Sequence, residues 1–171
     1  KAKADIVGTK LDDKGIIPEE LDKLINKLKS EGKNIKYLYS IPEFQNPTGS
    51  TMPSQRRKEV LQILSKHGLP LLEDDCYVDL RFEGESQDSY KSLDETGSVI
   101  HVASFSKLIA PGLRMGYVNA PIEIMKRLNY LKTSGPSQFV SLAIENFLKN
   151  EMDSHKEKIT ALLREKRDAM V

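Results

Sequence analysis

Short apolar runs alternate with amphipathic helical patterns along most of this chain, and this alternation constrains the fold more than any other feature. Strand-like runs cover residues 35–41, 69–72 and 99–103. A helix that begins at Pro18 precedes the first run, and a helix over residues 54–66 separates the first run from the second. Chains in which strands and helices alternate in this way form α/β domains. We therefore expect an α/β fold with a mostly parallel sheet and helices on both of its faces.

One strand of this sheet is expected to run against its neighbours. The link between Ala103 and a short strand-like run over residues 117–120 contains a Pro-Gly pair and no helical pattern. Such a link is barely long enough for the crossover that joins two parallel strands. An antiparallel strand begins at the edge where the preceding strand ended. The antiparallel arrangement would therefore keep Arg114 close to Lys107.

Local signals alone predict the remaining segments. Residues 5–9 resemble a weak strand, and the polar insertion over residues 84–94 resembles a loop. The helical spacing of apolar residues predicts one helix from Pro121 and another through residues 139–148. The stretch over residues 151–171 predicts a highly charged helix.

Charge balance and cysteine content exclude several classes of protein. The 171 residues carry 26 Lys and Arg against 25 Asp and Glu, a net charge of +1, so no basic surface for nucleic acid is expected. No apolar run reaches the length of about 18 residues that indicates a membrane span. Cys76 is the single cysteine, which excludes a disulfide framework and favours a reducing, cytoplasmic setting. The 3 histidines show no ligand spacing, so no metal site is expected.

Polar side chains follow each of the expected parallel strands. Because the carboxyl ends of parallel strands meet at one edge of a sheet, we expect these side chains to converge where open α/β sheets bind ligands. A lysine between hydroxyls, with an arginine further along, suits an anionic group together with an amine that can attack a carbonyl. The expected cluster consists of Asn46, Asp74, Tyr77, Ser104, Ser106, Lys107 and Arg114.

Lys107 and Asp74 suit the reactive part of one cofactor, pyridoxal phosphate, a pyridine aldehyde that carries a phosphate and a phenolic oxygen. Lys107 would form a Schiff base with the aldehyde and, once freed, would transfer protons. Asp74 would pair with the protonated ring nitrogen and keep the ring an electron sink. Asp75 is the rival of Asp74, and the Asp-x-x-Tyr spacing to Tyr77 favours Asp74. We predict Lys107, Asp74 and Tyr77 as the catalytic residues.

The other polar groups suit the rest of this cofactor. Asn46 and Tyr77 would donate hydrogen bonds to the phenolic oxygen. Ser104, Ser106 and Arg114 would hold the phosphate, since a guanidinium binds phosphate through two parallel hydrogen bonds. All of these residues, with Asp74 and Lys107, form the predicted cofactor site.

Taken together, the motifs resemble the signature of class I/II aminotransferases of the fold-type I pyridoxal-phosphate family. They comprise Asn46-Pro47-Thr48-Gly49, Asp74-x-x-Tyr77, and Ser104-x-Ser106-Lys107 with Arg114. The contexts over residues 73–77 and 110–114 look most like the branch of 2-aminoadipate, kynurenine and aromatic aminotransferases. That branch also includes the aminotransferase-like domains of GntR/MocR-type transcription regulators.

This resemblance implies that the chain is a central part of the large domain of such an enzyme. Residues 1–150 would form a partial domain that binds pyridoxal phosphate, and residues 151–171 would begin a charged helix leading toward a small domain outside the chain. The complete protein would be a cytoplasmic homodimer that transfers an amino group between an amino acid and a 2-oxo acid. The fragment alone is expected to be inactive.

Two other interpretations remain open at this point. The same fold serves as the effector-sensing domain of transcription regulators, where turnover is not the purpose. A lyase or decarboxylase of the same family is the other alternative, because the shared residues do not fix which bond to the α-carbon breaks. In the family, the residue that usually clamps the substrate carboxylate lies in the small domain, so these residues do not specify the substrate.

Overall fold

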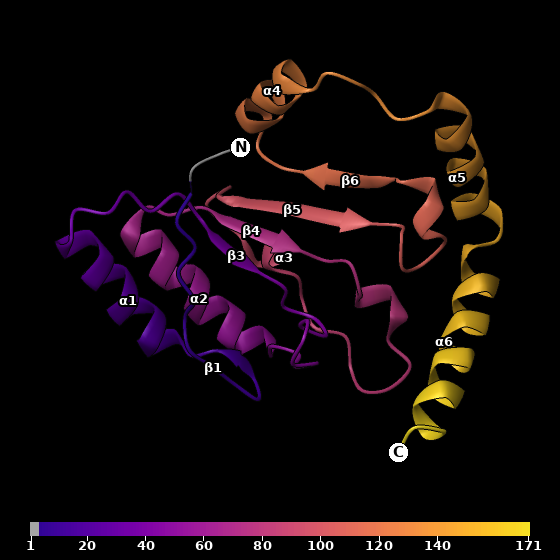
Figure 1. The fold of residues 1–171 in the computed structure, drawn as a ribbon, viewed down its shortest axis with the longest axis horizontal. Coiled ribbons are helices and arrows are strands. Elements are labelled where there is room, and N and C mark those ends of the chain that lie inside the picture. The colour runs from indigo at the N-terminus through magenta and orange to yellow at the C-terminus, as the bar shows by residue number, and fades with distance from the viewer. Residues whose placement is uncertain (1–3) are drawn as a thin grey trace.

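A four-stranded mixed sheet forms the centre of the molecule (Figure 1). The computed structural model describes residues 4–171. The sheet consists, in spatial order, of β3 (Leu38–Ser40), β4 (Leu71–Asp74), β5 (Val99–Ser104) and β6 (Gly116–Asn119). Strands β3, β4 and β5 are parallel, and β6 runs antiparallel to β5. The predicted α/β fold with a mostly parallel sheet and one antiparallel strand is confirmed.

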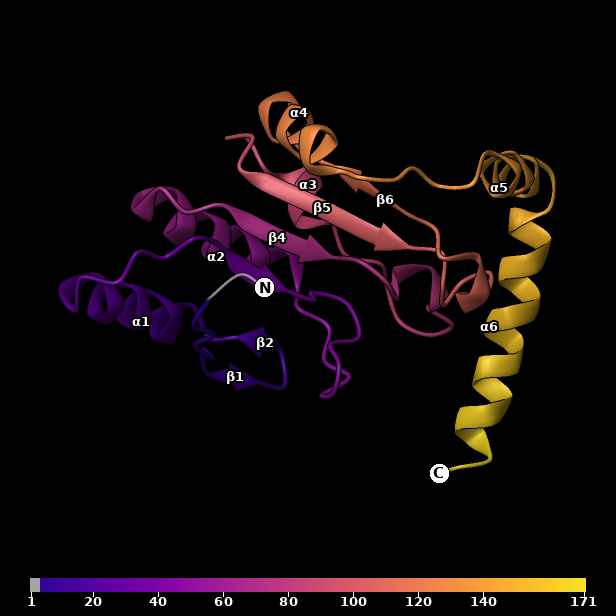
Figure 2. The ribbon, with the colours of Figure 1, turned by 45° about the horizontal axis from the view of Figure 1, so that its top comes forward.

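Helices α1 (Pro18–Ser30) and α2 (Ser54–His67) pack against each other on one face of the sheet (Figure 2). Pro18 suits the first turn of α1, where its missing N–H has no partner to lose. Gly68 ends α2 in the left-handed conformation, with φ of 67°. Full burial of each large apolar side chain contributes about 1.5–3 kcal/mol. The core between these helices and the sheet includes Leu21, Ile25, Val60, Leu64, Leu71 and Val99.

The two faces of the sheet differ in how well they are covered. Leu71 and Val99 point toward the core and are 0% exposed. On the opposite face, Tyr39 is 50% exposed and Val118 is 39% exposed. Within residues 4–171, the predicted helical cover therefore holds for one face of the sheet, and the second face remains partly open.

Residues 5–9, where a strand is expected, form no strand, and a short hairpin of two-residue strands follows them. Strands β1 (Leu11–Asp12) and β2 (Gly15–Ile16) pair antiparallel with each other, while residues 4–10 have no regular structure. Ile6 is 96% exposed, because no neighbouring strand within the described residues pairs with this segment. The prediction of a strand there was wrong, since a strand needs a hydrogen-bonded neighbour as well as apolar residues.

The polar insertion over residues 84–94, expected to be a loop, contains the short helix α3 (Tyr90–Leu93). The Ser89 hydroxyl accepts a hydrogen bond from the Ser92 backbone N–H at 3.0 Å and caps the helix. The buried Glu73 carboxylate accepts the N–H groups of Tyr90 and Lys91 at 2.7 and 2.9 Å. A helix of this length has no periodic pattern, and a distant carboxylate stabilises its first turn.

Three helices follow β6 and lie outside the sheet (Figure 1): α4 (Ile122–Leu131), α5 (Gln138–Asn150) and α6 (Met152–Asp168). They confirm the helices predicted from Pro121, through residues 139–148 and near the C-terminal end of the chain. Helix α6 packs beside the short 3-10 helix η1 (Val78–Leu80) and is joined to it by an ion pair between Lys156 and Asp79 at 2.7 Å. The described residues contain no helix that is both long and apolar enough to cross a membrane.

Candidate active site at the strand ends

The ends of β3, β4 and β5 and the loops that follow them carry six of the predicted site residues, and all three loops leave the same edge of the sheet (Figure 1). This edge is where the carboxyl ends of parallel strands meet and where open α/β sheets bind ligands. Arg114 belongs to the same edge, since the antiparallel strand β6 starts there, two residues after it. The topology thus brings the ends of three strands together, as the sequence predicted.

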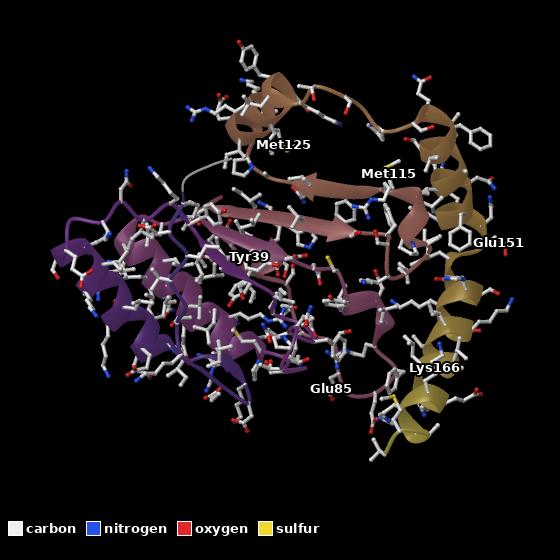
Figure 3. The ribbon with its side chains drawn as sticks, viewed as in Figure 1. Tyr39, Glu85, Met115, Met125, Glu151 and Lys166 are labelled. Atoms are coloured by element: carbon white, nitrogen blue, oxygen red, sulfur yellow. The ribbon has the colours of Figure 1, made fainter. Side chains whose placement is uncertain are left out.

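Asp74 is the last residue of β4, and its carboxylate accepts two hydrogen bonds in the structure. The phenol of Tyr39 on β3, which is labelled in Figure 3, donates to Oδ2 at 2.6 Å, and the thiol of Cys76 donates to Oδ1 at 2.7 Å. A carboxylate can accept about four hydrogen bonds in total, so both oxygens retain accepting capacity. Asp74 is therefore held in place but still able to bind a further donor.

Asp75 is directed differently from Asp74. Asp75 Oδ2 forms a hydrogen bond with His101 Nε2 at 3.1 Å. Both side chains are largely buried, with Asp75 11% and His101 10% exposed. His101 lies on the core-facing side of β5, in register with Glu73. The hydrogen bond to Asp75 and the nearby Glu73 raise the pKa of His101 above its ordinary value. This pairing takes up one oxygen of Asp75, and the other oxygen is buried without a hydrogen-bond partner among the described residues. Asp74 is therefore the carboxylate that a ligand can reach.

Lys107 lies in the turn that follows β5. The turn is closed by backbone hydrogen bonds from Ile109 and Ala110 to the Phe105 carbonyl, at 2.8 and 3.3 Å. Leu108 next to the lysine is only 4% exposed, so it anchors the turn while the lysine itself is exposed. Within residues 4–171, no carboxylate lies within ion-pair distance of the Lys107 ammonium.

The charge of Lys107 reaches the group around Asp74. Burial and the Asp74 carboxylate raise the pKa of the Cys76 thiol to about 12, and Lys107 acts in the opposite direction. Tyr77 follows Asp74 by three residues, and Lys107 follows the end of β5, the strand parallel to and next to β4. Asp74, Tyr77 and Lys107 therefore belong to the same edge of the sheet.

Ser104 and Ser106 form a compact hydroxyl pair beside the lysine. Ser104 Oγ donates to Ser106 Oγ at 3.0 Å, and it accepts the Ser106 backbone N–H at 3.2 Å. The Phe105 N–H donates to the Met115 carbonyl at 3.1 Å and extends the pairing of β5 and β6 into this loop. Arg114, which precedes Met115, is exposed and adopts a left-handed backbone conformation with φ of 50°.

Asn46 stands apart from the other predicted residues. It is exposed in the loop after β3, beside a cis Asn46–Pro47 peptide bond, and its carbonyl accepts a hydrogen bond from Gln45 Nε2 at 2.6 Å. No hydrogen bond or ion pair joins its side chain to the rest of the predicted site in the described part of the chain. The structure thus places Asn46 at the correct edge of the sheet but does not bring it into contact with the other candidates.

A buried ion cluster fixes the Asn46 loop, and sequence patterns did not predict it. Glu43, only 2% exposed, binds Arg57 of α2 at 2.6 Å and also binds Arg81 after η1. Arg57 in turn donates to the carbonyls of Met52 and Pro42, at 2.8 and 3.3 Å, and so closes the two ends of the loop. The cluster ties the Asn46 loop to the segment that follows Tyr77. Arg56 and Arg57 are neighbours on the polar helix α2, and nothing in their sequence pattern indicates that Arg57 is buried.

One open hollow of about 860 Å³ lies near this edge, between α6 and the segment over residues 78–86. None of the predicted site residues lines it, and its walls are largely charged. The described residues contain no cluster of His, Cys, Asp and Glu that could hold a metal ion. The exposed strand edge, rather than this hollow, carries the groups suited to catalysis.

Comparisons with known proteins agree with this geometry. An aromatic-amino-acid aminotransferase of Thermococcus litoralis is 36% identical over 170 residues, which are 94% of this chain and 40% of that protein. An uncharacterized HTH-type transcriptional regulator of Bacillus subtilis, YisV, is 38% identical over 140 residues, which are 78% of this chain and 28% of that protein.

The crystal structure of Pyrococcus horikoshii kynurenine aminotransferase, in complex with PMP, superposes with a TM-score of 0.89 at 35% identity. The match covers 94% of this chain and 41% of that one, so the chain spans about two-fifths of the length of such relatives. The family model for aminotransferase class I and II matches residues 2–171. The chain therefore belongs to the class I and II aminotransferase family.

Proposed function

We propose that the complete protein is a pyridoxal-phosphate-dependent aminotransferase that transfers an amino group between an amino acid and a 2-oxo acid. The observation that carries this proposal is the position of Asp74 at the end of β4, with accepting capacity left on both of its oxygens and next to β5, the parallel strand after which Lys107 follows. Membership in the aminotransferase family supports the same reaction.

The residues present fit pyridoxal phosphate at this edge. Asp74 keeps free acceptor sites on both oxygens, which suits a protonated ring nitrogen. Ser104 and Ser106 offer two adjacent hydroxyls. Arg114, in the same connection between β5 and β6, offers a cation that has no carboxylate partner within residues 4–171. An anionic phosphate would satisfy these donors.

In this proposal each side chain has a separate task. When bound, the cofactor supplies the electron sink that makes the proton on the substrate α-carbon removable. The Lys107 amine holds the cofactor at rest and moves that proton as a general base and acid. Asn46 and Tyr77 donate hydrogen bonds to the phenolic oxygen. Asp74 holds the ring nitrogen in its protonated form.

Replacement of Lys107 by alanine in the full-length protein tests the reaction. We expect oxo-acid formation from amino donors to fall by at least about a hundredfold, because the general base is lost. Borohydride reduction of the wild-type protein with its cofactor should add the mass of the cofactor to the peptide that contains Lys107. The corresponding peptide of Lys107→Ala should carry no added mass. Lys126→Ala, on the exposed surface of α4, is the matched control and should behave as the wild type. Undiminished oxo-acid formation by Lys107→Ala would rule out the assignment.

A second function is supported by the match to a transcriptional regulator. The similarity to YisV covers most of this chain. In that case, the complete protein would bind DNA through a segment outside residues 1–171, and amino donors would act as effectors. DNA binding that responds to amino acids, without catalytic oxo-acid formation, would favour the regulator over the enzyme.

A cytoplasmic homodimer completes the proposal. Large apolar side chains are exposed on two helices outside the sheet, with Tyr130 of α4 at 89% and Phe139 of α5 at 81%. A second subunit would bury such groups. The free thiol of Cys76 suits a reducing compartment. The native mass of the full-length protein, measured by light scattering, tests the dimer.

A further inference from the structure

Among residues 4–171, Tyr39 is the one side chain from a neighbouring strand that donates a hydrogen bond to the Asp74 carboxylate. It lies on β3, with its backbone in register with Leu72 on β4, and its phenol reaches the carboxylate two residues further along β4. The hydrogen bond from Tyr39 Oη to Asp74 Oδ2 is 2.6 Å long (Figure 3). Nothing in the sequence pattern pointed to this contact, since the two residues are 35 positions apart.

This hydrogen bond fixes the direction of the carboxylate. Together with Cys76 on the other oxygen, Tyr39 also limits rotation of the carboxylate plane. Of the two donors, the phenol is the stronger, because a thiol is a weak hydrogen-bond donor.

The phenol remains a donor throughout the physiological pH range. Burial, and then the hydrogen bond to Asp74, raise the pKa of Tyr39 well above its ordinary value. The residue is half exposed on the open face of the sheet, so its position is not explained by packing in the core. Its most specific interaction is the one with Asp74.

We propose that Tyr39 is a positioning residue that keeps the Asp74 carboxylate oriented toward the ring nitrogen of the cofactor. This inference rests on the proposed function, because it takes Asp74 as the partner of that nitrogen. A carboxylate held in this orientation accepts the N–H of the ring and keeps the proton on the nitrogen. Without Tyr39, the carboxylate is free to rotate away, and the ring nitrogen loses the acceptor that holds its proton.

The test compares Tyr39→Phe with Tyr37→Phe in the full-length protein. Both substitutions remove one phenolic oxygen from a half-exposed tyrosine, at 50% and 53% exposure, but in the described residues only Tyr39 donates to a carboxylate. The readouts are the dissociation constant of pyridoxal phosphate, the melting temperature of the cofactor-free protein and the ¹⁵N chemical shift of the labelled ring nitrogen in the bound cofactor.

We expect Tyr39→Phe to weaken cofactor binding about tenfold, since a hydrogen bond to a charged group is lost. The ¹⁵N shift should move toward the value of unprotonated pyridine. The melting temperature of Tyr39→Phe should match that of Tyr37→Phe. The proposal is overturned if both variants give the same ¹⁵N shift, or if Tyr39→Phe lowers the melting temperature without moving that shift.

Asp74→Asn separates this inference from the proposed function. If Asp74→Asn leaves cofactor binding and the ¹⁵N shift unchanged, Asp74 is not the partner of the ring nitrogen, and both proposals fail. If Asp74→Asn weakens binding while Tyr39→Phe matches Tyr37→Phe, the role of Tyr39 alone is overturned.

Discussion

At the scale of single residues, Gly116 allows β6 to approach the end of β5. A Cβ atom added at this position would overlap the Ala103 carbonyl oxygen, which belongs to the backbone and cannot move aside freely. The register places Gly116 opposite Ser104, at the start of the candidate site. A side chain here would push β6 away from the serine pair.

We therefore expect Gly116→Ala to destabilise the full-length protein by about 1–3 kcal/mol, because overpacking forces a shift of the backbone. Urea unfolding measures the change. Gly112→Ala is the control, since a Cβ there meets no atom within 4 Å among the described residues. Equal unfolding midpoints for the two variants would contradict this account of Gly116.

The buried group of Glu73, Asp75 and His101 predicts a pH dependence of stability. The pKa of His101 is raised by the hydrogen bond to Asp75, and burial raises the pKa of Glu73. A group whose pKa is higher in the folded state stabilises that state fully below its unfolded pKa, about 6.5 for histidine. The contribution is lost as the pH rises through the folded pKa.

The wild-type protein should therefore lose stability relative to His101→Gln as the pH increases from 6 to 9. The slope should not exceed about 1.4 kcal/mol per pH unit for one group. Urea midpoints of the two proteins across this range give the measurement. A difference that is constant with pH would show that His101 is not protonated preferentially in the folded state.

At the scale of elements, the Arg57–Glu43 pair connects α2 to the loop that carries Asn46. Both side chains are buried, at 1% and 2% exposure, and Arg57 also donates to the Asp88 carbonyl at 3.0 Å. Removal of Arg57 takes away one of the two arginines that compensate the buried Glu43 carboxylate, and it leaves the Met52 and Pro42 carbonyls without its hydrogen bonds. Breaking a buried pair in this way costs about 3–5 kcal/mol. The loop geometry depends on this pair more than on its turn residues.

Arg57→Met should consequently destabilise the full-length protein by about 3–5 kcal/mol in denaturant unfolding. The adjacent Arg56→Met is the matched control, since Arg56 is 21% exposed and pairs with Asp12 near the surface. We expect the control to cost about 1 kcal/mol or less. A smaller effect of Arg57→Met than of the control would show that the buried cluster is not needed.

The sequence predicted most elements because their patterns are local. Apolar runs and turn residues located β4, β5 and β6, and helical spacing located α1 and α2. The predictions of a strand over residues 5–9 and of a loop over residues 84–94 failed for another reason. Their states depend on neighbours: a missing strand partner in one case and the Glu73 carboxylate in the other.

At the scale of the whole molecule, the described chain leaves both edges of its sheet open. Strands β3 and β6 have one neighbour each within residues 4–171. Open edges and exposed apolar side chains favour association and loose packing. The chain spans about two-fifths of the length of its relatives, whose remaining parts cover equivalent surfaces in our proposal.

A polypeptide of residues 1–171 alone should therefore melt without a sharp transition and bind an apolar dye. Differential scanning calorimetry with added pyridoxal phosphate checks this expectation, with the full-length protein as the control. A cooperative transition of the short polypeptide that shifts upward with the cofactor would contradict it.

The sequence by itself determined the fold class, the family and the edge of the sheet at which the candidate residues gather. Strand ends follow from local pattern, and parallel strands necessarily bring their carboxyl ends together. The spacing of Asp74, Tyr77, Ser104, Ser106 and Lys107 along the chain was therefore enough to propose a cofactor.

Only the tertiary structure decided which groups surround that site. Whether Asp74 or Asp75 is available to a ligand depends on the face of the sheet to which each side chain points. The Asp75 side chain forms a hydrogen bond with His101. The contacts of Tyr39 with Asp74 and of Arg57 with Glu43 join residues 35 and 14 positions apart. Such contacts arise from strand register and burial, which depend on the assembled fold, because no local pattern records the distance between two remote side chains.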